Sequence, residues 1–279
     1  MIASDLMSSP VYIVSANEHV AHARNLMLKH RVSRLPVMEG DEQLEGIITR
    51  KDIAYGLRHT EPVWRRRPID RIPVRVLMTP DPITITPETG TKDIASLMVN
   101  NNISGIPVAE ADRVVGIVTK SDLLKSNLIR NLGLTAEDLM SDVVTISRYH
   151  SLDHIINLMR ERNDKILVMN DDGTLAGIIT ESNLAFFEYM SDSGVTEKDV
   201  TILRKERYAG PKRFRYVMDV SAVAEDVMNR PVITVAPDTS VSELVRIMRE
   251  HRITSLVVES QGDVRGIVKR DDIIREVAK

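Results

Sequence analysis

Two pairs of polar residues stand at the same short spacing in this chain of 279 residues, and their side chains could bind a ligand. Thr49 stands three positions before Asp52, and Thr119 three positions before Asp122, each directly after an apolar run. At a helix start, this spacing places a hydroxyl and a carboxylate beside free backbone N–H groups, where the helix dipole favours anions. The carboxylate can accept the two hydroxyls of a ribose, and the threonine can donate to a phosphate. Each pair is therefore a candidate for holding a nucleotide.

The same spacing also has a purely structural interpretation. In a helix-capping box, the hydroxyl and the acid satisfy the unbonded N–H groups of the first turn, and no ligand is involved. Repetition does not decide between the two interpretations, because a duplicated fold duplicates its caps. Both remain open at this point.

The two pairs belong to a phrase that occurs four times, in which a glycine and two apolar residues precede the polar positions. The four copies are Gly46–Asp52, Gly116–Asp122, Gly177–Asn183 and Gly266–Asp272. A methionine stands about 37 to 39 positions before each glycine, at Met7, Met78, Met140 and Met228. Four copies at a near-constant interval indicate one supersecondary unit used four times.

The second copy shows most clearly which elements position the polar residues. A β-prone run at 82–85 precedes Ile94, Leu97 and Met98, whose spacing predicts a helix with one buried stripe. Two apolar runs at 106–108 and 114–118 flank a polar turn and predict a hairpin. A second helix is expected from Ser121. Each unit is therefore predicted to be β-α-β-β-α, over roughly 55 to 60 residues.

The predicted fold class is α/β, in two domains at 1–132 and 133–279. The four units are expected at about 1–60, 72–132, 133–190 and 220–279. Units this small bury little surface alone and should pair. Because the connection from the second to the third copy is short, we expect the four units to form one compact disc with pseudo-twofold symmetry. Its exposed helix faces leave a homodimer open.

Several of these phrases resemble cystathionine β-synthase (CBS) domains. The resemblance lies in Ser33–Val37 (Ser-Arg-Leu-Pro-Val), in Ser104–Val108 (Ser-Gly-Ile-Pro-Val) and in the Gly-x-x-Thr-x-x-Asp endings, and it covers nearly the whole chain. In that family, two units pair as a Bateman module whose clefts bind AMP, ADP, ATP or S-adenosylmethionine. A chain of four units resembles the γ regulatory subunit of AMP-activated protein kinase and stand-alone archaeal and bacterial CBS-pair proteins. The resemblance implies two Bateman modules and an adenosine-containing regulatory ligand.

The resemblance also assigns roles to individual residues. The ribose would be bound by Asp52, Asp122, Asn183 and Asp272. The phosphates would be bound by Arg34, Thr49, Lys51, Thr119, Lys120, Thr180 and Lys269. The adenine pocket would be formed by Val32, Pro36, Ile83, Thr84, Ile103, Ile106 and Pro107.

Differences between the copies rank these four candidate sites. The first two copies carry the complete threonine and aspartate pair. In the third copy, Asn183 replaces the acid and Glu181 would place a negative charge near a phosphate, so we expect a weak or empty site. In the fourth copy, Lys269 replaces the threonine and supplies a cation that could bind a phosphate as a point charge, while Asp272 keeps the ribose role.

Composition restricts the remaining function classes. The chain is 43% hydrophobic and 28% charged with a formal net charge of −3, so no global bias points to nucleic acid or anionic lipid. Without cysteine there is no disulfide, thiolate metal site or thiol catalysis. No apolar run approaches the roughly 20 residues of a membrane span, and the first residues lack a signal-peptide pattern. We expect a cytoplasmic protein.

No catalytic constellation is found. Phosphate-loop, dinucleotide and hydrolase motifs do not occur. His19 with His22, and His150 with His154, have metal-ligand spacing but lack a third ligand, so we expect no metal. We therefore expect neither an enzyme nor a catalytic cofactor, but an energy-sensing regulatory protein that conveys its ligand state to an unknown effector protein.

Two basic stretches, at 58–75 and 204–215, leave an alternative function open. Each combines arginines with aromatic residues, a pattern that suits nucleic-acid backbones and acidic proteins alike. They could also be solvated linkers, or they could fold over the clefts and contact ligand phosphates. The alternative is a nucleic-acid-binding regulator in which the CBS units serve as scaffold.

A gel-shift assay with duplex DNA and with RNA separates this alternative from nucleotide sensing. Binding through phosphate contacts must weaken steeply as salt rises, so we expect little complex at physiological salt. Tight binding at that salt, lost when Arg65, Arg66 and Arg67 are replaced by alanine, would make nucleic acid the first candidate.

Overall fold

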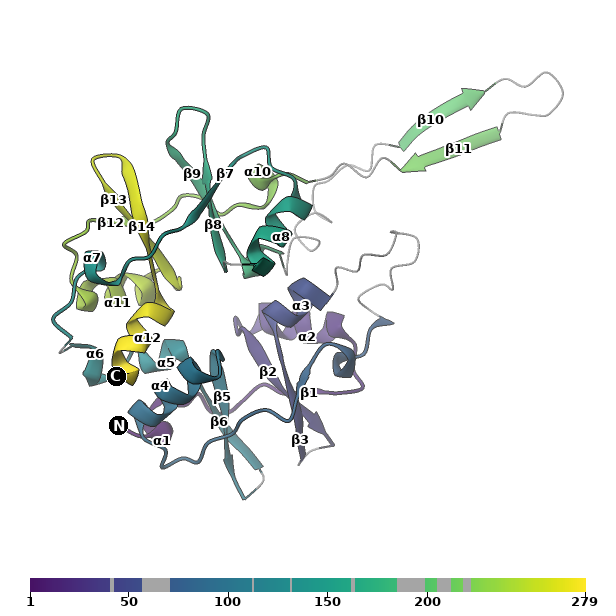
Figure 1. The fold of residues 1–279 in the computed structure, drawn as a ribbon. Coiled ribbons are helices and arrows are strands. Elements are labelled where there is room, and N and C mark those ends of the chain that lie inside the picture. Colours follow the sequence, from purple (N-terminus) through teal and green to yellow (C-terminus); the bar gives the residue numbers. More distant parts are fainter. Residues whose placement is uncertain are drawn as a thin grey trace. The chain divides into compact units, whose positions relative to one another are not determined.

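The computed structural model describes residues 1–40, 43–56, 71–111, 113–130, 132–161, 164–184, 199–204, 212–217 and 222–279. Contacts divide the chain into a first unit, Met1–Val144 with Pro231–Lys279, and a second unit, Thr145–Arg230. Figure 1 shows the elements of each unit. Most of the basic stretch at 58–75 and the centre of the one at 204–215 lie outside the described residues.

The four copies repeat one order of elements. The first comprises α1 (Ala3–Leu6), β1 (Val14–Ser15), α2 (Val20–Lys29), β2 (Arg34–Glu39), β3 (Gln43–Thr49) and α3 (Arg50–Gly56). The second comprises η3 (Val74–Val76), β4 (Thr79–Pro80), α4 (Thr91–Asn100), β5 (Gly105–Glu110), β6 (Arg113–Thr119), α5 (Lys120–Leu123) and α6 (Asn127–Arg130). The third comprises α7 (Ala136–Leu139), β7 (Val144–Ser147), α8 (Leu152–Glu161), β8 (Lys165–Met169) and β9 (Leu175–Thr180).

A two-stranded antiparallel hairpin of β10 (Asp199–Arg204) and β11 (Lys212–Val217) separates the third copy from the fourth. The fourth copy comprises α10 (Ala224–Val227), β12 (Thr234–Val235), α11 (Val241–Glu250), β13 (Ser255–Ser260), β14 (Asp263–Lys269) and α12 (Arg270–Ala278). The α/β class and the predicted helix-strand-strand-helix order are confirmed. The β-prone run at 82–85 forms less than a strand, since only Ile85 makes a parallel bridge, to Val108.

Each copy also begins with a short helix that we did not predict. In α1, α7 and α10, an aspartate accepts a hydrogen bond from the backbone N–H at the start of the helix. The pairs are Ile2 with Asp5 at 3.0 Å, Thr135 with Asp138 at 2.8 Å and Val223 with Asp226 at 2.9 Å. An aspartate two residues before each of these methionines was the available signal, but a single turn carries no periodicity.

The hairpin register is the same in all four copies and fixes the motif position. Thr49 pairs with Arg34, Thr119 with Gly105, Thr180 with Lys165 and Lys269 with Ser255. Four residues further along, each register shifts by a bulge, after which the pairing resumes towards the turn. The motif residue therefore always lies at the open end of its hairpin, opposite the first residue of the preceding strand.

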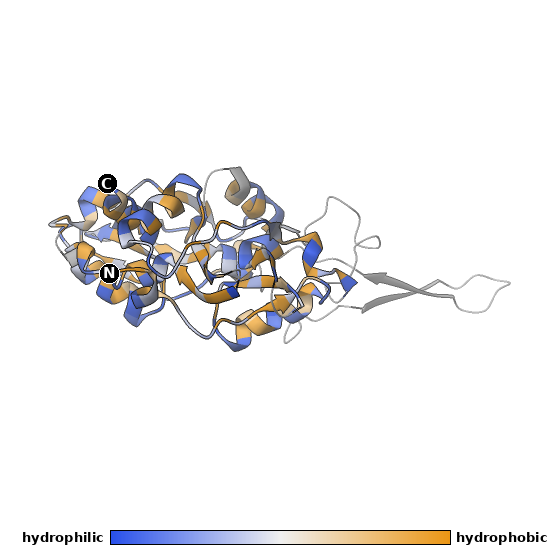
Figure 2. Cartoon of the chain, turned by 90° about the horizontal axis from the view of Figure 1, so that it is seen from below, coloured by the Kyte–Doolittle hydropathy of each residue, from blue (hydrophilic) through white to orange (hydrophobic). Residues whose placement is uncertain are grey.

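The core of the first unit joins the second copy to the fourth. Ile94 and Met98 on α4 and Ile273 and Ile274 on α12 are at most 1% exposed and lie in one apolar cluster. Ala278 at the end of α12 accepts a hydrogen bond from Ser96 on α4 at 3.4 Å. Figure 2 shows helices that carry both hydrophobic and hydrophilic residues along their length, as one-sided burial requires.

Each repeated methionine packs near the glycine of a neighbouring copy. The first residues of each copy pack on the hairpin of its neighbour, through the bridges Ser8 to Ile117, Thr79 to Ile47, Ser141 to Ile267 and Asn229 to Ile178. A Cβ atom at Gly46 would lie 2.8 Å from Sδ of Met78, and one at Gly116 would lie even closer to Sδ of Met7.

The same relation holds for the other two copies. A Cβ atom at Gly177 would overlap Sδ of Met228 inside the second unit, and one at Gly266 would lie 2.8 Å from the carbonyl of Ser141 inside the first. A side chain at any of these glycines would therefore displace the neighbouring copy. The first and second copies exchange their first residues, and so do the third and fourth.

Replacement of Gly116 by alanine tests this contact. We expect Gly116→Ala to lower the free energy of unfolding by about 1–3 kcal/mol through overpacking. In combination with Met7→Ala, which makes room for the new methyl group, the loss should fall short of the sum of the two single losses by about 0.5–3 kcal/mol. Urea unfolding measures all three variants. Gly262 faces open space, so the losses in the free energy of unfolding from Gly262→Ala and Met7→Ala should be additive. Additive losses from Gly116→Ala and Met7→Ala would contradict the packing.

Candidate functional site

The motif residues of the first two copies form helix caps. In the first copy, Oδ2 of Asp52 accepts hydrogen bonds from N of Thr49 at 2.8 Å and from Oγ1 at 2.7 Å. In the second, Oδ2 of Asp122 accepts from N of Thr119 at 3.0 Å and from Oγ1 at 2.7 Å. The capping interpretation is thus realised in the structure, and it uses one carboxylate oxygen of each aspartate.

The other two copies retain the cap with different residues. In the third, Oδ1 of Asn183 accepts from N of Thr180 at 3.0 Å and from its hydroxyl at 2.7 Å. In the fourth, Oδ2 of Asp272 accepts from N of Lys269 at 2.8 Å. An amide therefore serves as well as a carboxylate for the cap, so capping alone does not require the aspartates.

The second polar atom of these side chains distinguishes the copies. Oδ1 of Asp122 accepts from Lys125 at 2.7 Å, and Oδ1 of Asp272 accepts from Arg275 at 2.8 Å. Nδ2 of Asn183 donates to the carbonyl of Val227, in the exchanged segment of the fourth copy, at 2.7 Å. The third copy thus has a neutral amide, bonded within the fold at both atoms, where the other three copies have a carboxylate, and the missing charge agrees with its low rank as a ligand site.

The side chain of Arg34, in the first copy, forms hydrogen bonds to the second copy. Its guanidinium donates to the carbonyl of Ser104 at 2.6 Å and to the hydroxyl of Ser104 at 2.8 Å. It lies against Gly105, where a Cβ atom would overlap it. Burial, followed by repulsion from Arg270, lowers the pKa of Arg34 to about 10, while the charge of Asp122 acts in the opposite direction. Arg34 remains a cation at neutral pH, half-buried at the junction of the two copies.

Lys120, a predicted phosphate ligand, lies in a contact with the fourth copy. Its side chain is 5% exposed, and Nζ is 2.7 Å from Oδ2 of Asp271. In return, the guanidinium of Arg270 donates to Oγ of Ser121 at 2.7 Å. The first turns of α5 and α12 therefore hold one another through reciprocal polar contacts.

The remaining predicted phosphate residues lie at the same hairpin ends. Lys51 is exposed in the first turn of α3, Lys269 is half-buried at the end of β14, and Thr180 ends β9. The fourth copy therefore presents a cation at the position where the other three present a hydroxyl.

The predicted adenine residues divide into two groups. Pro36, Ile106 and Pro107 are buried within the hairpins. The other four, Val32, Ile83, Thr84 and Ile103, are half-buried or exposed, and Ile83 is 38% exposed. The carbonyl of Val32, two residues before β2, accepts a hydrogen bond from Arg50 at 3.0 Å, which brings this segment close to a basic side chain. Only the second group has surface available to a base.

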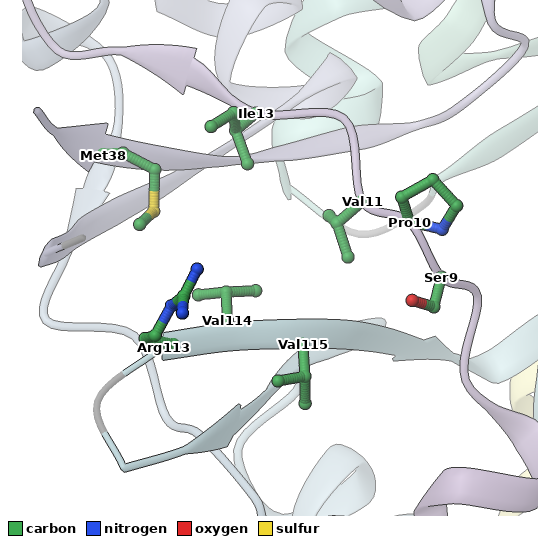
Figure 3. Close-up of a pocket in the computed structure, with 8 residues that line it drawn as sticks. All are labelled: Ser9, Pro10, Val11, Ile13, Met38, Arg113, Val114 and Val115. Carbon is green, nitrogen blue, oxygen red and sulfur yellow. The ribbon is translucent and has the colours of Figure 1, made fainter. Parts of the chain in front are cut away.

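Two cavities of the first unit are lined by other residues. One of about 260 Å³ lies between the segment after α1 and the start of β6, and its lining is Ser9, Pro10, Val11, Ile13, Met38, Arg113, Val114 and Val115. Figure 3 shows Ile13 and Met38 on one side of it and Val114 on the other. The second, of about 280 Å³, lies beside Met1 and Leu128. Neither contains a predicted ligand residue.

The structure adds residues to the site that the sequence interpretation did not include. They are Ser104, Ser121, Arg270 and Asp271. A signal for Arg270 was present, because the residue after the motif threonine position is basic in three copies, as Arg50, Lys120 and Arg270. The third copy has Glu181 there.

Metal and membrane features are not found in the described part of the chain. No group of three potential metal-ligating side chains occurs there. His22 lies 3.8 Å from Glu18, and the rings of His150 and His154 stack with centroids 5.0 Å apart. No helix among the described residues is both long and apolar enough to cross a membrane.

With this geometry established, the comparisons with known proteins assign the family. The CBS domain model matches residues 3–59, 66–128, 136–188 and 223–279, so the chain belongs to the CBS domain family. An uncharacterized 33.4 kDa protein from the ribosomal RNA operon of Thermofilum pendens is 26% identical over 283 residues, 97% of this chain and 89% of that protein. Another relative, from Methanocaldococcus jannaschii, is longer, and the match spans 44% of it.

A solved structure of similar length shows the same fold. A protein of M. jannaschii, described as a candidate archaeal homologue of g-AMPK, superimposes with a TM-score of 0.78 at 20% identity and covers 99% of both chains. A CBS domain pair from another M. jannaschii protein, solved with 5-methylthioadenosine and S-adenosyl-L-methionine, is 30% identical over 45% of this chain and 94% of that chain, with a TM-score of 0.39. The chain is thus a four-copy CBS protein with an AMPK γ-like fold.

A substitution at Asp52 tests the electrostatics of the motif. Burial raises the pKa of Asp52 above its ordinary value, although hydrogen bonds from Thr49 oppose this. The fold therefore disfavours the ionised carboxylate at neutral pH. Asp52→Asn keeps the cap, as Asn183 does, and should raise the free energy of unfolding at pH 7. The gain should shrink as pH falls through the raised pKa towards the unfolded value of 3.8.

Asp138→Asn on α7 is the matched control, and we expect the opposite change in the free energy of unfolding. Asp138 forms the same cap with Thr135, and those hydrogen bonds lower the pKa of its carboxyl. Its stabilising contribution is present above the unfolded pKa and is lost as pH falls through the lowered value, so Asp138→Asn should destabilise at pH 7. Thermal melts between pH 3 and 7 measure both variants; a loss for Asp52→Asn at pH 7 would contradict the interpretation.

Proposed function

We propose that this protein is a non-enzymatic regulator that binds an adenosine nucleotide at the junction of its first and second CBS copies. Its ligand state is conveyed to an effector protein that acts in trans. The ribose would be bound by Asp52 or Asp122, and the phosphates by the threonines and the surrounding cations. Membership of the CBS family supports the adenosine ligand, since the pairs of that family carry such ligands in their clefts.

One observation carries this proposal most directly. Arg34 spans the junction of the first two copies, and both motif aspartates lie within its electrostatic reach. Two carboxylates and a half-buried cation thus converge from two copies, at the open ends of both hairpins. An acceptor for sugar hydroxyls beside a donor for phosphate is the chemistry that a nucleotide requires.

The roles of the motif aspartates are separable from their caps. Because Asn183 shows that an amide suffices for capping, the aspartates of the first two copies supply a charge that the helix start does not need. A charge without a structural requirement, held partly buried at a family ligand position, supports a binding role. The third copy, which has a neutral amide in place of the carboxylate, is proposed to contribute scaffold rather than a site.

Isothermal titration of the full chain with AMP, ADP, ATP and S-adenosylmethionine tests the proposal. At least one ligand should bind, and at 100 times its dissociation constant it should add about 2.7 kcal/mol to the free energy of unfolding. Asp52→Asn and Asp122→Asn remove a charged acceptor, so the affinity at the altered site should fall by roughly tenfold to a hundredfold.

Asp138→Asn is again the matched control. It alters the same Thr-x-x-Asp cap at a helix that carries no proposed ligand, and affinity should stay within about twofold. Absence of heat with all four ligands would refute nucleotide binding. An equal loss in Asp138→Asn would show that the motif acts through folding alone.

A further inference from the structure

The cavity of about 260 Å³ in the first unit lies towards the turn end of the second hairpin, away from its Thr-x-x-Asp motif. On β6, the first residue, Arg113, lines this cavity, whereas the last residue, Thr119, belongs to the motif. At about 3.4 Å per residue, the two ends of this strand are roughly 20 Å apart. The residues assigned to ribose, phosphate and adenine do not line the cavity. It is therefore a candidate for a second kind of site.

The walls of this cavity are largely apolar. Val11 and Ile13, in the segment that leads to β1, lie on one side together with Met38, and Val114 of β6 lies on the other. Ile13 is 42% exposed, which leaves apolar surface open to a ligand. A hydrocarbon chain placed between these walls would be removed from water and so gain binding free energy.

Arg113 supplies a charge at one end of the cavity. Figure 3 shows its side chain rising from the start of β6 into the gap beneath Met38, with Ser9 at the opposite end. Glu110 stands opposite Arg113 in the hairpin register, yet among the described residues Arg113 forms neither a hydrogen bond nor an ion pair. Its guanidinium is thus available to an anionic group of a ligand.

The apolar wall and the charge are particular to this place in the chain. Ile13 directly precedes the β1 residue that pairs with Val37, and Arg113 is the first residue of β6. The corresponding residues in other copies are Thr84 and Thr234 for the first position, and Gln43 and Asp263 for the second. The fold therefore requires neither an isoleucine nor an arginine in these positions, and their combination supports a binding role.

The size and surroundings of the cavity favour a small molecule. N of Ser8 donates to the carbonyl of Ile117 at 2.9 Å, and N of Ile117 donates to the carbonyl of Ser8 at 3.2 Å, so an extended peptide cannot add as a strand there. An apolar cavity of about 150 Å³ in another protein accommodates benzene. In proportion, 260 Å³ leaves room for roughly ten non-hydrogen atoms.

We propose that this cavity binds a small amphiphilic carboxylic acid, whose carboxylate is held by Arg113 and whose hydrocarbon chain lies between Ile13 and Val114. A guanidinium can donate to both oxygens of a carboxylate, which fixes the orientation of the acid. The segment at 9–13 belongs to the first copy and β6 to the second, so the bound acid also stabilises the pairing of these two copies. This site is additional to the proposed nucleotide site and does not depend on it.

Titration of the full chain with hexanoate, hexanol and hexylamine tests the proposal, since these probes share one chain and differ in charge. NMR spectra of protein with isotope-labelled methionine methyl groups report on Met38 in the wall, whose signal the variant Met38→Leu identifies. Met27, fully buried on α2, is the internal control. Hexanoate should shift the Met38 signal with a dissociation constant between roughly 10 μM and 5 mM. Hexanol should bind about threefold to tenfold more weakly, and hexylamine more weakly still.

Two variants separate the charge from the apolar wall. Arg113→Gln should lower hexanoate affinity by about threefold to tenfold and leave hexanol affinity unchanged. Arg265→Gln, at an exposed arginine on β14, is the matched control and should change neither. Ile13→Thr introduces the residue type that two other copies have in this position, and should weaken hexanoate and hexanol alike by roughly fourfold. Thermal melts establish that the variants fold, and the probe series on the unaltered protein does not depend on them.

Each outcome decides one part of the proposal. If the three probes leave the Met38 signal in place, or shift the Met27 signal equally, the cavity is refuted as a ligand site. If hexanol binds as tightly as hexanoate, or if Arg113→Gln matches Arg265→Gln, recognition of a carboxylate is refuted. Selection of hexanoate that is lost in Arg113→Gln alone supports the assignment, whatever the nucleotide titrations show.

Discussion

The rest of the structure depends on one contact, in which a methionine packs against a glycine of the neighbouring hairpin, where the absent Cβ atom leaves room for it. Met7 lies on Gly116 and Met78 lies on Gly46, so the first two copies hold one another by their own first residues. This exchange brings both Thr-x-x-Asp motifs to one junction and allows Arg34 to reach Ser104. Without the exchange, each motif would be a helix cap on an isolated unit, and no two carboxylates would share a cation. Pairing therefore precedes any binding chemistry.

The helix caps and the proposed binding site share the same side chains. Asp52 and Asp122 cap their helices with one oxygen, and the copies differ in how the second atom is used. In the third copy, Asn183 satisfies the cap without a charge and is bonded to the exchanged segment as well. A copy that keeps an aspartate retains a charge that capping does not require, which is the difference on which the proposed division into binding and supporting copies rests.

Much of the fold could be predicted from the sequence because its signals are local. The spacing of Ile94, Leu97 and Met98 marked a helix, the apolar runs around residue 111 marked a hairpin, and the Thr-x-x-Asp positions marked its end. The short helices before each methionine were not predicted because a single helical turn is too short to show a periodic pattern of apolar residues. Arg270 and Ser104 could not be placed because their roles depend on contacts between copies, and periodicity within a copy contains no information about them. The ligand roles of the individual residues stay predictions, as does the division at residue 132.

The exchange of first residues also bears on how the chain is synthesised. The segment around Met7 leaves the ribosome long before its partner hairpin at Gly116, which follows about 110 residues later. At about 5–20 residues per second, this segment remains without its partner for roughly 5 to 20 seconds. The contact of Met78 with Gly46 spans a much shorter stretch and can form earlier, so the first hairpin is covered before the second. During that interval the nascent chain exposes Leu6 and Met7, which become buried or partly buried in the finished protein. The exchange thus imposes an order of assembly on the first two copies, in which the beginning of the first copy docks after that of the second.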